Sequence, residues 1–74
     1  METSKLDAAR LHYAAKKAEA EETVKVYLRN SAGIGEHPQI MEELRKQIEI
    51  VSDAQDQMNT IDELISKYEN SQLK

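Results

Sequence analysis

The stretch Ala32-Gly33-Ile34-Gly35-Glu36-His37-Pro38 holds both glycines and the only proline of the chain. Gly33 stands where a helix can end in a left-handed residue, a conformation that glycine adopts without steric cost. Pro38 suits the first turn of a following helix, because the N–H that it lacks would have no partner there. The stretch therefore predicts a turn between two helices.

On both sides of this turn the sequence is free of glycine and proline. Alanine, the strongest helix former, is abundant before the turn. Ser4 can cap the first turn of the leading helix, and Asp7 completes a capping-box pair. We therefore expect a single helical-hairpin domain over residues 1–74, with a helix over 4–31, a loop over 32–37 and a helix over 38–69.

A seven-residue repeat runs through the second predicted helix. Leu44, Val51, Met58 and Ile65 follow it strictly, and Ile40, Gln47, Ala54, Ile61 and Tyr68 form the complementary set. In the first helix the repeat is Leu6, Tyr13, Ala20 and Tyr27. Such a pattern is typical of a coiled-coil seam. The residues that we expect to carry this seam are Tyr13, Tyr27, Leu44, Val51, Met58, Ile61, Ile65 and Tyr68. The spacing of Thr60 and Glu63 imitates a helix start, but we interpret the segment as continuous helix.

A loop of this length lets the two helices fold back antiparallel. Residues whose numbers sum to about 69 should then lie level. The expected neighbours are Ala20 with Ile48, and Lys16 and Lys17 with Asp53 and Asp56. The fold class is thus all-α, an antiparallel two-helix hairpin.

Apolar residues also occur beside the predicted seam. Val24 and Leu28 widen it near the turn, Ile48 neighbours it, and Ile50 points elsewhere. Two helices alone enclose no core, and a chain of 74 residues without cysteine needs help to be stable. We therefore expect self-association, with a dimer that forms a four-helix bundle, or docking on an unidentified larger protein.

The charge pattern bears on the kind of partner. The net charge is −4, with +1 over residues 1–32 and −5 over residues 33–74. A protein that binds nucleic acid without regard to sequence would need a basic excess, so no nucleic-acid partner is expected. Arg10 and Lys17 occupy seam positions, which weakens packing in the first half of the hairpin.

No catalytic residue, cofactor site or metal site is predicted. His12 and His37 lie far apart in a hairpin and show no His-Glu-x-x-His pattern. Gly33-Ile34-Gly35 lacks the Gly-Lys-Ser/Thr of a phosphate-binding loop. Ser31, Ser52 and Ser66 have no histidine within reach and no pocket around them. We interpret the chain as non-enzymatic.

The carboxylates of residues 47–66 are not interrupted by Lys or Arg. Glu49, Asp53 and Asp56 share a side of the helix, where they form a solvated face, pair with lysines, or bind a divalent cation weakly. The calcium-loop pattern fails, because Leu64 stands where its final Glu belongs. The sequence has no apolar run long enough to span a membrane and no signal peptide, so a cytoplasmic location is expected.

The segment Tyr27-Leu28-Arg29-Asn30-Ser31-Ala32-Gly33-Ile34-Gly35-Glu36-His37-Pro38-Gln39-Ile40, followed by an acidic amphipathic helix, resembles small uncharacterised helical-hairpin proteins of large tailed bacteriophages. The resemblance covers about half of the chain, and only the turn is specific. It implies a phage accessory protein made in the host cytoplasm, and no catalytic residues come with it.

These observations predict a protein–protein interaction or adaptor protein that self-associates. Its expected contact residues are Ile34, Glu36 and His37 in the loop, and Ile48 and Ile50 beside the seam. One alternative is a small structural component of a virion or other assembly. Another is an inhibitor that presents acidic residues (Asp53, Asp56 and Asp62) to a nucleic-acid-binding enzyme.

Overall fold

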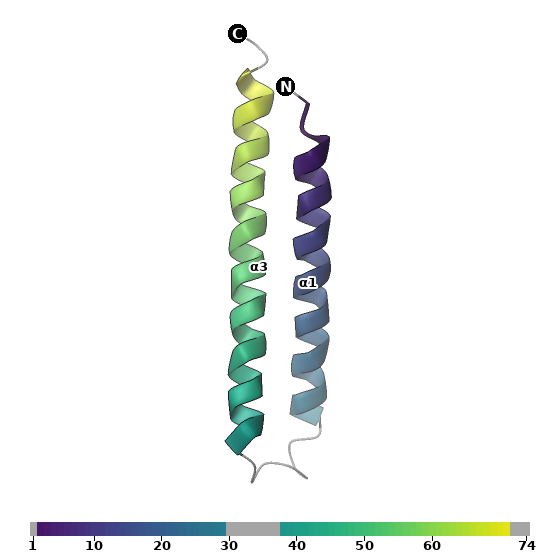
Figure 1. Ribbon diagram of the computed structural model, residues 1–74, viewed down its shortest axis with the longest axis vertical. Coiled ribbons are helices and arrows are strands. Elements are labelled where there is room, and N and C mark those ends of the chain that lie inside the picture. The colour runs from purple at the N-terminus through teal and green to yellow at the C-terminus, as the bar shows by residue number, and fades with distance from the viewer. Residues whose placement is uncertain (1, 30–37, 72–74) are drawn as a thin grey trace.

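The computed structural model of the chain describes residues 2–29 and 38–71, which form two long helices. Helix α1 spans Ser4–Arg29 and helix α3 spans Pro38–Ser71. The helices lie side by side and run in opposite directions, so that the start of α1 and the end of α3 lie at the same end of the molecule (Figure 1). The result is a rod of 60 × 14 × 12 Å. The predicted all-α hairpin is confirmed.

Helix α1 begins at Ser4, the predicted first residue, but the residue that caps it differs from the expected one. The Asp7 N–H donates to the Thr3 carbonyl at 3.0 Å, so Thr3 and not Ser4 is the capping position. The Ser4 N–H donates to the Glu2 carboxylate, whose longer side chain reaches back over the helix start. Hydrogen bonding to Ser4 holds the pKa of Glu2 below its ordinary value. At its other end, α3 continues to Ser71, two residues beyond the prediction.

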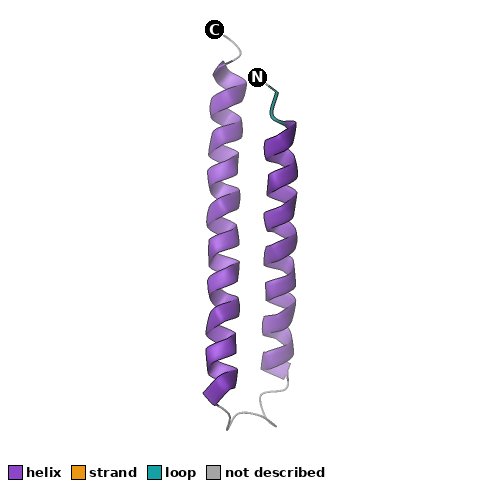
Figure 2. Cartoon of the chain, in the orientation of Figure 1, coloured by secondary structure: helices purple, strands orange, loops and turns teal. Residues whose placement is uncertain are grey.

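Helix α3 is continuous through the segment that imitates a helix start (Figure 2). The Thr60 hydroxyl donates to the carbonyl of Asp56, one turn earlier, at 3.0 Å. A threonine that bonds the preceding turn in this way stays within a helix. The continuous helix predicted here is therefore confirmed.

The core of the hairpin is narrow. Among the described residues, the buried apolar side chains are Ala20, Ala54, Met58 and Ile61. Ala20 and Ala54 are 3% and 1% exposed, so the backbones of the helices approach closely there. The other predicted seam residues are half-buried: Tyr13, Tyr27, Leu44, Val51, Ile65 and Tyr68. Two helices cannot bury a whole seam, because each keeps a large part of its circumference in solvent.

The register of the two helices differs from the expected one. Arg10 contacts Asp62 and Lys17 contacts Gln55, and the residue numbers of both pairs sum to 72 where 69 was predicted. The value of about 69 follows if the length of the turn alone aligns the two helices. Ile48 shares a groove with both Glu21 and Val24, so it lies within about one turn of the level expected beside Ala20.

Candidate interaction surface

One side of the hairpin carries an open groove of about 380 Å³. Glu21 and Val24 line it from α1, and Ile48, Val51 and Ser52 line it from α3. Val24 and Val51 are seam residues that remain only half-buried. The groove is therefore a place where the seam stays open to solvent on one side.

Large apolar side chains lie along the same side as the groove. Leu28 follows Glu21 by seven residues and Met41 precedes Ile48 by seven, so helical periodicity puts both on the side of the groove. Leu28 is 61% exposed, and Met41 and Ile48 are each 53% exposed. We call this side of the hairpin the groove face.

The groove face continues toward the chain ends with small residues. Ala14 precedes Glu21 by seven residues, and Leu11 and Ala18 flank it three and four residues away. Residues three and four apart are neighbours on a helix surface. Leu11 is 72% exposed, the largest exposed fraction among the large apolar side chains of the described residues. By contrast Val26, which is 49% exposed, lies about 200° around the helix from Val24 and so outside this face.

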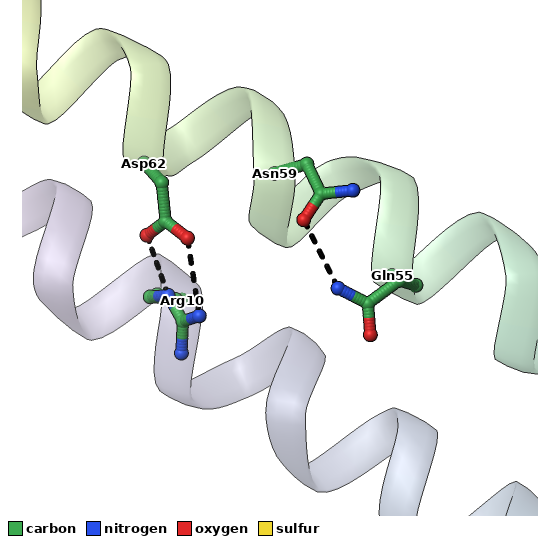
Figure 3. Close-up of polar contacts among 4 residues, drawn as sticks. All are labelled: Arg10, Gln55, Asn59 and Asp62. Atoms are coloured by element: carbon green, nitrogen blue, oxygen red, sulfur yellow. Dashed lines mark hydrogen bonds and ion pairs between the residues drawn. The ribbon is translucent and has the colours of Figure 1, made fainter.

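A bidentate ion pair joins the helices near the chain ends. The Arg10 guanidinium donates from Nε to Asp62 Oδ1 at 2.7 Å and from Nη2 to Asp62 Oδ2 at 3.2 Å (Figure 3). The pair holds the pKa of Asp62 below its ordinary value and raises that of Arg10. Both side chains are about half exposed, which weakens the attraction through solvent screening.

The second charged seam residue also has a partner across the helices. Lys17 Nζ donates to Gln55 Oε1 at 2.7 Å. Gln55 Nε2 in turn donates to Asn59 Oδ1 at 3.0 Å, within α3 (Figure 3). Arg10 and Lys17 thus replace apolar packing with directed polar contacts. Such contacts fix the register of a seam, although they stabilise it less than buried apolar residues do.

Replacing Asp62 with asparagine is expected to make the melting temperature depend less on pH in the acidic range. A carboxyl whose pKa is lower in the folded chain stabilises the fold above its ordinary value, and this contribution disappears as the pH falls through the lowered pKa. Asp62→Asn should therefore lower the melting temperature slightly at pH 7 and leave it unchanged below about pH 2, when carboxylates are protonated. Melting followed by circular dichroism checks this. Asp53→Asn, at an exposed residue, is the control, and an equal loss there would contradict the role of the ion pair.

The acidic residues do not form one continuous surface. Asp53 and Asp56 are exposed, whereas Asp62 is turned toward α1 by its ion pair. Lys17 bonds Gln55, the neighbour of Asp56, and within the described helices no ion pair joins Lys16 or Lys17 to Asp53 or Asp56. No group of three or more His, Asp or Glu residues that could hold a metal ion occurs within residues 2–29 and 38–71.

The predicted interaction residues fall in three places. Ile34, Glu36 and His37 lie outside the described residues. Ile48 lines the groove. Ile50 is half-buried, and it lies about 200° around the helix from Ile48, on the other side of the seam.

Sequence reasoning missed the exposure of Met41 and Leu11. A signal for Met41 was present, because it precedes Ile48 by one heptad and so shares its side of the helix. Leu11 had no large apolar neighbour at heptad spacing, since Ala18 and Lys25 follow it there. Its place on the groove face follows from helical periodicity only once Glu21 is known to line the groove.

The remaining candidates for chemistry are spread out. His12 packs edge-on against the Tyr13 ring, with centroids 5.0 Å apart and an interplanar angle of 77°.

Neither α1 nor α3, within the part that the structure describes, is long and apolar enough to cross a membrane. Comparison with known proteins yields no match to a family model, to a curated protein or to a solved structure.

Proposed function

We propose that this chain is a non-enzymatic interaction protein, which self-associates and binds a larger protein. The observation that carries the proposal is the groove face, where Val24 and Val51 of the seam stay half-buried beside the exposed Met41 and Ile48. Contiguous exposed apolar residues mark a surface that another protein covers. The loop residues Ile34, Glu36 and His37 remain the predicted contacts for the larger protein.

The groove also has the shape that helical partners use. An amphipathic helix places apolar side chains at intervals of three, four and seven residues into a hydrophobic groove. Residues of both α1 and α3 line the groove, so a partner helix laid along the hairpin would suit it. The resemblance of the turn to phage proteins, and with it a phage accessory role or a place in a virion, stays a prediction.

Affinity capture with the full-length chain as bait tests the proposal. The wild type should associate with itself or retain a protein from its native host at reproducible stoichiometry, and Ile48→Glu should weaken one or both associations. Val26→Glu is a matched control, because Val26 is similarly exposed but lies outside the groove face. A wild-type chain that stays monomeric and retains no protein above a mock bait would contradict the proposal.

A further inference from the structure

We propose that the groove face binds a second copy of this chain, with the turns of the two hairpins at opposite ends of a four-helix bundle. This inference rests on the proposed function, and it names the partner and the orientation of that surface. The size of the face, its distribution of large and small side chains, and its charge pattern each support it.

One whole side of the rod is large enough for a stable dimer. The rod is 60 Å long and 14 Å wide, so the footprint of that side is comparable to the ~800 Å² that each partner contributes to a stable interface of standard size. A second hairpin is also a rod of the same length, so it would cover the face from end to end. The exposed Leu11, far from the turn, and the exposed Met41, close to it, would both be covered.

On α1, the large and small side chains of the face lie in different halves. Leu28 lies in the half near the turn, whereas Ala14 and Ala18 lie toward the chain ends. Hairpins that face each other with opposite orientation place α1 against α1 and α3 against α3, so Leu28 of one copy lies over these alanines of the other, while Met41 and Ile48 lie against α3. In the same arrangement Leu28 of one copy comes level with Leu11 of the other. Alternation of large and small residues across facing helices is what gives well-filled cores.

The charges favour the same orientation. Lys25 and Arg45 lie on the groove face in the half near the turn, where Lys25 pairs with Glu22, and Glu21 lies near the middle. Asp7 and Asp62 lie near the chain ends, where Asp62 pairs with Arg10. Opposite orientation brings Arg45 of one copy toward Asp62 of the other. A bundle with both turns at one end would set Arg45 against Lys25 and Asp7 beside Asp62. Like charges in register are destabilising, so this pattern selects the orientation more than it adds affinity.

Sedimentation equilibrium of matched variants tests the surface. Ile48→Glu should raise the dimer dissociation constant about tenfold or more, because it places a charge inside the interface. Val26→Glu should leave it unchanged. Circular dichroism confirms that each variant is helical, and Leu11→Glu provides a second test at a residue whose side chain is 72% exposed in the hairpin. Wild-type association that neither Ile48→Glu nor Leu11→Glu weakens would overturn the inference.

Single-cysteine variants test the orientation, because the natural chain has no cysteine. Under a mild oxidant, Arg45→Cys mixed with Asn59→Cys should form a disulfide-linked heterodimer, and Arg45→Cys mixed with Lys25→Cys should not. The reverse result would overturn the proposed orientation. A wild-type chain that is monomeric yet captures another protein through Ile48 would overturn this inference and the proposed self-association, and would leave only the proposed binding of a larger protein standing.

Discussion

Replacing Ile61 with aspartate is expected to unfold the hairpin. Ile61 is 6% exposed and belongs to the small set of buried residues between the helices. A buried carboxylate without a partner is strongly unfavourable, and even Ile61→Ala should cost about 2–5 kcal/mol. A chain of this size has a free energy of unfolding of roughly 4–11 kcal/mol, so the loss removes much of its stability. Helical ellipticity at 222 nm, followed against temperature, measures the effect.

The control for this variant changes the same charge at an exposed position. Asn59→Asp adds one negative charge two residues away, and a carboxylate can still accept the hydrogen bond from Gln55. It should therefore melt within a few degrees of the wild type. The melting temperature of Val51→Asp should fall between those of Ile61→Asp and Asn59→Asp, because Val51 is half-buried at the edge of the groove. Equal melting of Ile61→Asp and Asn59→Asp would mean that the seam does not hold the helices together.

The second large effect is expected where the helices come closest. Ala20 is 3% exposed, so a leucine at this position must push α1 away from α3 or adopt a strained rotamer. Ala20→Leu should cost about 1–3 kcal/mol, and each kcal/mol lowers the melting temperature of a small domain by roughly 4–8 °C. Thermal melts in identical buffer, at a fixed protein concentration, measure this loss.

The matched control for this prediction is Ala15→Leu. Ala15 is exposed on the same helix, and leucine and alanine have similar helix propensities. The control should change the stability by no more than about 0.5 kcal/mol. If Ala20→Leu were as stable as Ala15→Leu, the close approach at Ala20 and Ala54 would be wrong.

The sequence predicted the fold because its signals are local. The glycines and proline of residues 32–38 separate two long segments that contain neither, and each segment repeats its apolar residues every seven positions. Such signals decide where helices form and which stripe they bury. Ala54, Met58 and Ile61, the buried residues of α3, all lie on the predicted stripe.

The register could not be predicted in the same way, because it depends on contacts between distant residues. Arg10 with Asp62 and Lys17 with Gln55 align the helices, and nothing in the local sequence around any of these residues indicates its partner. The groove likewise depends on residues of both helices, because it brings Glu21 and Val24 beside Ile48 and Val51.

The capping prediction erred by one residue for a related reason. Ser4 has the side chain that favours a cap, but the Glu2 carboxylate accepts from the Ser4 N–H and the Thr3 carbonyl accepts the first helical hydrogen bond, so the helix begins one residue earlier than a Ser4 cap requires. Competing caps one residue apart differ by little in free energy. A pattern in the sequence cannot choose between them.

The central claim is that this hairpin is half of a larger bundle, and sedimentation equilibrium of the unmodified chain tests it most directly. One chain has a mass of 8.4 kDa. At micromolar concentration we expect a mass of about twice that value, falling toward the monomer on dilution, with helicity that decreases as the dimer dissociates. A mass of 8.4 kDa at every concentration, with full helicity throughout, would contradict the claim.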